Sequence, residues 1–257
     1  MTDAPAPAQP RIPAATLVIF RQPNPAAVPE LLMVQRAATM RFAAGAVVFP
    51  GGRIDAADRG LAERIGMSGD LEDLAARIAA IRETLEETGL ALGLDRPISA
   101  VQAAEARRVL QAEGTLAAVL DRYGWGLHTA SLVPFARWCQ PDVGGFDTRF
   151  FLASLGTGAV DIAVDATENS RLFWASAATV LAHADAGAIR VIFPTRRNLE
   201  RLARHANFGD ACADANAHPV TSITAQREWR EGQEWLIIPD GLGYPVLGEP
   251  LAKAQRG

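Results

Sequence analysis

The chain has 257 residues, of which 49% are hydrophobic and 21% charged, and its formal net charge is −4. This composition excludes a mainly disordered chain, a collagen and a coiled coil. The acidic balance argues against general electrostatic binding to nucleic acid, and no uncharged apolar run is long enough to suggest a membrane span. Cys139 and Cys212 cannot build a disulfide framework, which favours a reducing compartment and a cytoplasmic location.

Three short apolar runs near the N-terminus are typical of β-strands. They cover residues 16–20, 30–35 and 46–49. Proline and asparagine at residues 23–25 separate the first two runs, so we expect a hairpin with a proline-rich loop. Residues 1–13 are rich in alanine and proline and lack a long apolar core, which predicts a flexible tail rather than a signal peptide.

The clearest helix is predicted over residues 71–88, where Asp70 is a suitable N-cap and Gly89 a suitable left-handed stop. An apolar stripe marks the face that should be buried: Leu71, Leu74, Ile78, Ile81 and Leu85. Residues 103–123 are helix-prone with a break near Gly114, and we expect a helical insert at about residues 100–125.

The remaining elements follow the same signals. Strands are predicted at residues 131–138, 148–153 and 160–164, helices near 176–184 and 195–206, and a last strand at 235–238. Strands and helices alternate without a strict βαβ order, which favours the α+β class. Trp125, flanked by Gly124 and Gly126, is a candidate for an exposed aromatic side chain that stacks on adenine.

Three glutamates stand on one face of the helix predicted at residues 71–88. Viewed from Glu83, Glu86 lies about 60° to one side and Glu87 about 40° to the other, whereas the apolar stripe falls on the opposite side. Carboxylates so close together repel one another, and a divalent cation such as Mg²⁺ would relieve this repulsion. Arg82 could pair with one of them. The simpler alternative is a solvated acidic helix face.

The segment RETLEETGL at residues 82–90 resembles the second half of the Nudix box, and Gly52, which follows FPG, stands where the box begins. The sequence departs from this motif in two ways. The interval from Gly52 to Arg82 is 30 positions (82 − 52), longer than in the standard box, and Asp58 and Leu74 occupy the places where an early glutamate is expected. That early acid is therefore lost or replaced by Asp58.

Membership of the Nudix family would imply an α+β sandwich, with a mixed curved sheet between helices. It would also imply one or more Mg²⁺ or Mn²⁺ ions held by Glu83, Glu86 and Glu87, with the Gly52 carbonyl completing the metal shell. The domain would then span residues 14–206, and residues 207–257 would form a C-terminal extension that the resemblance does not place. Weaker resemblances at residues 146–151, 165–174 and 194–202 extend the match to about residues 15–204.

The segment RAATMRFAAGAVVFPGG at residues 36–52 is similar to the pattern of coenzyme A diphosphatases within that family. This similarity implies that Arg36 and Arg41, with Gly45 in the same loop, bind substrate phosphates, as two arginines beside a glycine loop can do. The substrate implied is coenzyme A or acyl-coenzyme A, cut to 3′,5′-ADP and (acyl) 4′-phosphopantetheine. The alternative is that Arg36 and Arg41 merely flank a surface loop.

The expected activity is therefore metal-dependent hydrolysis of a diphosphate bond in a small nucleoside diphosphate derivative, with no nucleic acid or membrane partner. Glu83 and Glu168 are both candidates for the general base. The alternatives are another substrate such as ADP-ribose, or a non-catalytic binding module of the same fold. A third alternative gives the insert at 100–125 a role in forming a homodimer.

Overall fold

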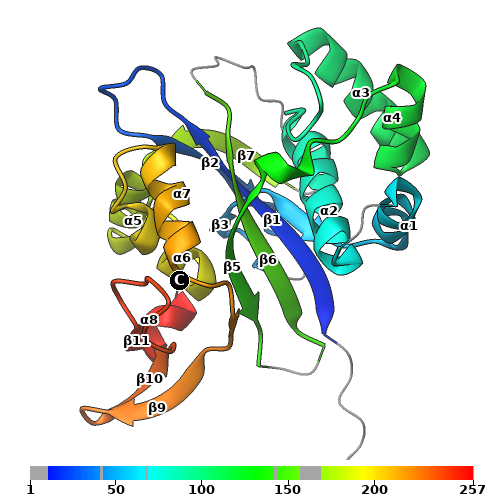
Figure 1. Ribbon diagram of the computed structural model, residues 1–257. Coiled ribbons are helices and arrows are strands. Elements are labelled where there is room, and N and C mark those ends of the chain that lie inside the picture. Colours follow the sequence, from blue (N-terminus) through cyan, green and yellow to red (C-terminus); the bar gives the residue numbers. More distant parts are fainter. Residues whose placement is uncertain (1–10, 41–42, 67–68, 142–143, 157–168, 257) are drawn as a thin grey trace, which may run out of the picture.

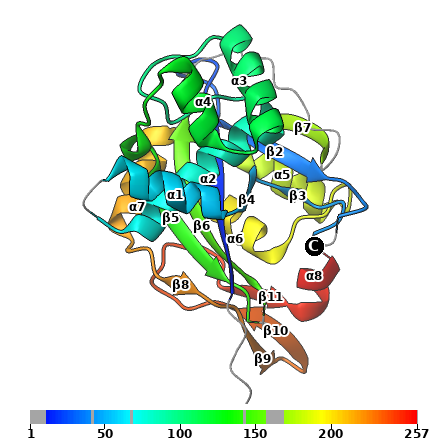
Figure 2. The same ribbon diagram turned by 90° about the vertical axis from the view of Figure 1, so that its right-hand side faces the viewer.

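The computed structural model describes residues 11–40, 43–66, 69–141, 144–156 and 169–256. Its centre is a mixed sheet with helices packed on both faces (Figures 1 and 2). The described strands of this sheet are β1 (Ile12–Arg21), β2 (Glu30–Arg36), β3 (Val47–Val48), β4 (Gly51–Arg53), β5 (Val133–Cys139), β6 (Phe146–Ser154), β7 (Asn169–Ala175) and β8 (Ser222–Ile223). Their order is β3-β2-β1-β6-β5-β8, with β4 also beside β1 and β7 beside β2. The predicted α+β class is confirmed.

Strand β1 is the centre of the sheet because its side chains are apolar on both faces. It runs parallel to β6 and antiparallel to β2 and β4. Leu17 and Ile19 pack into one hydrophobic cluster, and the alternating Val18 and Phe20 pack into a second cluster on the opposite face. The predicted hairpin of the first two strands is present.

Four helices cover the first face of the sheet and three cover the second (Figure 1). The first group is α1 (Ala56–Ile65), α2 (Leu71–Thr88), α3 (Ala100–Glu113) and α4 (Leu116–Tyr123), and the second is α5 (Ala177–Asp185), α6 (Phe193–Leu202) and α7 (Phe208–Ala217). Both counts of helices refer to the described residues only. The predicted insert at 100–125 is the pair α3 and α4, which separates at Gly114 in the left-handed conformation, with φ 71°.

Helix α2 begins and ends where the sequence predicts. The side chain of Asp70 accepts hydrogen bonds from the backbone N–H groups of Glu72 and Asp73, and Gly89 ends the helix with φ 76°. Leu74, Ile78, Ile81 and Leu85 of the predicted stripe are buried in the core, and α2 packs on β1 and α1. Leu71 is exposed, against the prediction, because it lies in the first turn of the helix, beyond the core. Helix α1 has 10 residues and lies within the long interval between Gly52 and Arg82, ahead of the start of α2 at Leu71.

Three expectations are corrected by the structure. Ile12 and Pro13, which were predicted as part of a tail, belong to strand β1 because they pair with β6, and residues 1–10 lie outside the described residues. Trp125 is buried rather than exposed, because its ring stacks on Tyr123 with 4.7 Å between ring centroids. The run at 235–238 is not the last strand, because β11 (Gly248–Pro250) follows it. The strand expected at 160–164 lies outside the described residues.

The end of the chain adds a small second sheet. Strands β9 (Gln226–Arg230), β10 (Gln233–Ile237) and β11 form this sheet in the order β11-β10-β9, and the short helix α8 (Leu251–Arg256) follows it. Strand β8 joins the extension to the main sheet by pairing in parallel with β5. Among the described residues, no helix is long and apolar enough to cross a membrane.

Candidate functional site

The three glutamates of α2 lie where this helix meets the loop between β3 and β4. Glu87 is buried, the Glu83 side chain is 14% exposed and the Glu86 side chain is 38% exposed. All three line one large cavity, which Gly51 and Gly52 also line. The alternative of a solvated acidic helix face is therefore not what the structure shows, because two of the three carboxylates are largely removed from bulk water.

Gly51 and Gly52 allow the backbone of β4 to touch these carboxylates. The Gly51 N–H donates a hydrogen bond of 2.9 Å to Oε2 of Glu87. A Cβ atom on Gly52 would lie 2.3 Å from Oε1 of Glu83, and one on Gly51 would lie 2.4 Å from the backbone oxygen of Ala15. A side chain at either position would therefore displace the carboxylates or the central strand.

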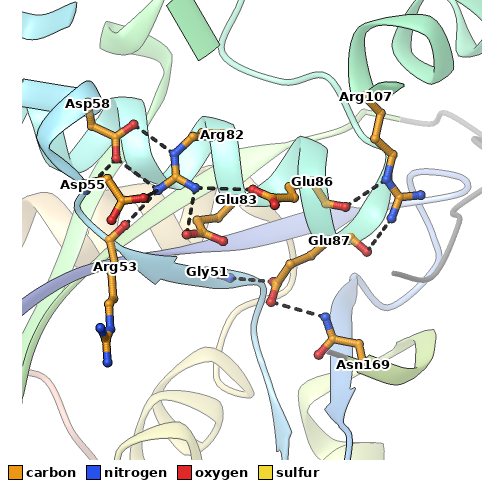
Figure 3. Close-up of polar contacts among 10 residues, drawn as sticks. All are labelled: Gly51, Arg53, Asp55, Asp58, Arg82, Glu83, Glu86, Glu87, Arg107 and Asn169. Atoms are coloured by element: carbon orange, nitrogen blue, oxygen red, sulfur yellow. Dashed lines mark hydrogen bonds and ion pairs between the residues drawn. The ribbon is translucent and has the colours of Figure 1, made fainter. Parts of the chain in front are cut away.

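Arg82 organises the other side of the cluster, as Figure 3 shows. Its Nε and Nη2 each donate a 3.0 Å hydrogen bond to the buried carboxylate of Asp58, and Nη2 also donates to the Arg53 carbonyl at 2.9 Å. Its Nη1 then lies 3.0 Å from Glu83 Oε1 and 3.4 Å from Glu86 Oε2. Asp58 thus holds Arg82 against two of the three glutamates.

Two residues from other elements complete the environment of α2. Asn169, the first residue of β7, donates from Nδ2 to Oε1 of Glu87 at 3.3 Å. Arg107 of α3 donates from Nε to the backbone oxygen of Glu86 at 2.8 Å, so a cation faces carbonyl groups at the C-terminal end of the helix (Figure 3). The helical insert therefore contributes directly to holding the glutamates in place.

Burial raises the pKa of Glu83 from an ordinary value of 4.5 to about 8. The Arg82 guanidinium opposes this shift, while the carboxylates of Glu87 and Glu86 add to it. Arg82 is itself buried, which alone would lower its pKa, but its hydrogen bonds to Asp58 and the nearby carboxylates raise that pKa above the ordinary range. Without a bound cation, Glu83 is therefore held mainly in its protonated form at neutral pH.

This shift predicts how the stability of the metal-free protein depends on pH. Glu83 ionises near pH 4.5 in the unfolded chain but only near pH 8 in the folded protein, so its contribution is complete below pH 4.5 and is lost as pH rises to 8. We expect the free energy of unfolding of the wild type, relative to that of Glu83→Gln, to decline over this interval. Urea unfolding of both proteins in EDTA at several pH values measures the difference, and parallel curves would contradict it.

The residues present suit a hard divalent cation, because their donors are carboxylate oxygens. Glu83 and Glu86 face the same nitrogen of Arg82, whereas Glu87 turns toward Gly51 and Asn169 (Figure 3). In the described ranges, no three acidic, histidine or cysteine side chains are already arranged as a metal cluster. Mg²⁺ commonly binds through one or two carboxylates, with water and substrate phosphates as its other ligands. Two of these glutamates are therefore sufficient for such a site.

The cavity has a volume of about 1460 Å³ and extends well beyond the glutamates. Arg36, which was predicted to bind substrate phosphates, lines it at the end of β2. Gly45, between β2 and β3, adopts a positive φ of 70° and does not line the cavity. Arg41 and Glu168 lie outside the described residues.

Two site residues were not predicted from the sequence. Asn169 reaches Glu87 from a strand 82 positions away, and no local pattern indicates that contact. Arg53 directly follows Gly52 and lines the cavity, with its guanidinium 5.9 Å from the centroid of the Phe146 ring. Within the described part of the chain, no ion pair involves the Arg53 side chain, which points away from the Arg82 cluster in Figure 3. Arg53 could have been predicted as a site residue from its position directly after the glycine pair Gly51 and Gly52.

Known structures share this architecture. A NUDIX hydrolase from Alicyclobacillus acidocaldarius is 30% identical in sequence with a TM-score of 0.67, and the match covers 80% of this chain and 96% of the other. A MutT/nudix family protein from Enterococcus faecalis is 16% identical, with 67% of this chain and 46% of the other covered and a TM-score of 0.38. An Ap4A hydrolase from C. elegans is 17% identical, with coverage of 79% and 93% and a TM-score of 0.37. No profile of a known protein family matches the chain.

Proposed function

Because the chain belongs to the Nudix hydrolase family, we propose that it hydrolyses the P–O–P bond of a nucleoside diphosphate derivative with the help of a divalent cation. The observation that carries this proposal is that Glu83, Glu86 and Glu87 line one cavity together with the glycine pair of β4. Buried, like-charged side chains at the wall of a large cavity are costly unless a cation or proton compensates them, which is typical of a functional site.

The glutamates of α2 would hold Mg²⁺ or Mn²⁺. When bound, such an ion supplies positive charge to the diphosphate oxygens and lowers the pKa of water. The protein fixes the geometry around it. Asp58 anchors Arg82, Arg82 orients Glu83 and Glu86, and the Gly51 N–H and Asn169 orient Glu87.

Glu83 is our candidate for the group that accepts the proton of the attacking water. It faces the cavity and lies against Gly52, and a cation bound beside it would displace its proton and leave a carboxylate that can accept a proton from water. Glu168 is the alternative and lies outside the described residues. Once this proton is taken, the water oxygen attacks phosphorus and the bridging oxygen leaves with one of the two phosphates.

The substrate proposed is coenzyme A or an acyl derivative, cut to 3′,5′-ADP and (acyl) 4′-phosphopantetheine. This choice rests on the similarity of residues 36–52 to the coenzyme A diphosphatase pattern. The position of Arg36 at the cavity wall supports it, and the neighbouring Arg53 adds a second guanidinium for phosphate groups. The same pattern is the basis for proposing that Arg41 and Gly45 also bind the substrate phosphates.

A substrate comparison tests this function. Purified protein is incubated with coenzyme A, an acyl-coenzyme A or ADP-ribose, with Mg²⁺ or Mn²⁺ and with EDTA as the control, and the products are identified by mass spectrometry. We expect 3′,5′-ADP and 4′-phosphopantetheine from coenzyme A, and no turnover in EDTA. Turnover of ADP-ribose alone would move the assignment to another nucleoside diphosphate. Absence of metal-dependent turnover on every diphosphate tested would favour a non-catalytic binding module.

A further inference from the structure

We propose that the C-terminal extension forms the subsite for the arm of the substrate that carries no nucleotide. For coenzyme A this is the pantetheine arm with any acyl group. The inference rests on the proposed function, and it concerns residues 207–257, which the family resemblance left unplaced.

The first support is that residues of the extension line the same cavity as the glutamates. They come from three places: the segment that leads from β8 into β9, Leu236 on β10, and Leu251 and Gln255 on α8. The cavity volume of about 1460 Å³ exceeds the roughly 300–1,000 Å³ usual for a small-molecule site. A diphosphate group and a nucleoside would leave much of this space empty, so the cavity suits a substrate with a second, long arm.

The order of the strands shows where the extension joins the main sheet. From β3 the strands run in the order β3-β2-β1-β6-β5-β8, and the glycine pair of β4 lies beside β1. Arg36 stands at the end of β2, on one side of the glycine pair. The extension enters at β8, beyond β6 and β5, and crosses from there to α8, which lies on the side of β3 in Figure 2 and whose Lys253 is 3.5 Å from Asp185 of α5. The extension therefore forms a wall of the cavity that runs from β8 to α8 and is separate from the strands β2 and β4, which carry Arg36 and Arg53.

The lining residues of the extension differ in chemistry from those of β2 and β4. The side of β2 and β4 presents the guanidinium groups of Arg36 and Arg53, which suit the phosphates of a nucleotide. The extension presents mainly apolar and neutral side chains: Thr224, Ala225, Gln226, Leu236, Leu251 and Gln255. Its charged member, Arg227, lies 3.7 Å from the carboxylate of Glu234. Apolar side chains and neutral amides complement a chain of methylene and amide groups better than they complement phosphates.

The extension is firmly attached, so it can serve as a fixed wall. Glu249 of β11 is buried, and its Oε2 lies 3.5 Å from both Nε of Arg196 and Nη2 of Arg197 on α6. The Tyr244 hydroxyl donates a 2.8 Å hydrogen bond to Asn198 Oδ1 of the same helix. Figures 1 and 2 show α8 and the small sheet lying against the α6 end of the main sheet.

The test reduces the space of the cavity beside the extension and leaves the glutamates unchanged. Leu251→Trp adds bulk where α8 lines the cavity, and Gln255→Trp, at an exposed position, is a second variant in case the first does not fold. Val246→Trp is the matched control, because Val246 is exposed in the same extension and does not line the cavity. Each protein is assayed for hydrolysis of coenzyme A, with 3′,5′-ADP and 4′-phosphopantetheine as separate inhibitors.

We expect Leu251→Trp and Gln255→Trp to raise the inhibition constant of 4′-phosphopantetheine at least about tenfold while that of 3′,5′-ADP changes less than about twofold. The control variant should match the wild type. Equal effects on both inhibitors, an effect on 3′,5′-ADP alone, or no effect would overturn the assignment of this subsite while leaving the proposed function standing. A wild type that hydrolyses another diphosphate but neither cuts coenzyme A nor binds 4′-phosphopantetheine would overturn both.

Discussion

Glu86→Gln is expected to lower kcat/KM for the diphosphate substrate by a factor of at least about 100. The substitution keeps the shape of the side chain but removes one of the negative charges available to the divalent cation. A bound cation stabilises the charge of the transition state by several kcal/mol, and each 1.4 kcal/mol corresponds to a factor of about ten in rate. Steady-state hydrolysis at saturating Mg²⁺ measures the effect.

The fold should survive this change, because the Glu86 side chain is 38% exposed and its backbone contacts do not depend on its charge. Equal melting temperatures of variant and wild type in EDTA would establish this. Glu63→Gln is the matched control, since Glu63 is an exposed glutamate on α1 that does not line the cavity. If Glu86→Gln retained most of the wild-type rate, the proposal that the α2 carboxylates hold the catalytic cation would be wrong.

Asp58→Asn is expected to lower the free energy of unfolding by about 3 kcal/mol, because breaking one partner of a buried ion pair leaves the other charge buried and unpaired. Asp58 is 1% exposed and holds Arg82 through two hydrogen bonds of 3.0 Å, while its Oδ2 also caps α1 by accepting from the Asp55 N–H. The carboxylate of Asp55, 3.5 Å from Arg82, limits the loss. Urea denaturation measures it.

Asp121→Asn provides the comparison for this effect. Asp121 pairs with Arg64 at 2.8 Å, but both side chains are at least half exposed, so the pair should contribute less than about 1 kcal/mol. The two substitutions remove the same charge from the same residue type, and burial is the difference between them. Similar losses in both variants would show that Asp58 does not anchor Arg82 as described.

Local signals explain which parts of the fold could be predicted from the sequence. The helix over residues 71–88 was predicted to the residue, because Asp70, Gly89 and the apolar stripe all act within a few positions of one another. The α3–α4 break at Gly114 was readable for the same reason. The Trp125 interpretation was wrong because flanking glycines do not reveal that Tyr123 stacks on its ring.

Only the part of the site that lies on α2 could be predicted from the sequence. The spacing of Glu83, Glu86 and Glu87 placed them together on α2, but their partners come from distant positions. Asp58 reaches Arg82 across 24 positions, and Asn169 reaches Glu87 across 82. Such contacts are set by the pairing of strands and the packing of helices, which no short pattern encodes. For the same reason, the position of the C-terminal extension at the cavity could not be predicted, because it depends on the pairing of β8 with β5.

The arrangement of the carboxylates also shows what a bound cation must change. Arg82 now compensates Glu83 and Glu86, and a proton is favoured on Glu83 up to about pH 8. Metal binding requires the carboxylates to be deprotonated, so it should release protons at neutral pH. Before a cation binds, Arg82 therefore holds Glu83 and Glu86 in place, while Gly51 and Asn169 position the third carboxylate, Glu87.

The most direct test of the whole account is the position of a bound manganese ion. A crystal grown with Mn²⁺ and a non-hydrolysable diphosphate analogue is measured at a wavelength where manganese scatters anomalously. The account predicts an anomalous peak between α2 and β4, within about 2.2 Å of oxygen atoms from at least two of Glu83, Glu86 and Glu87. A peak elsewhere, or none at these oxygens in a protein that hydrolyses diphosphates, would contradict it.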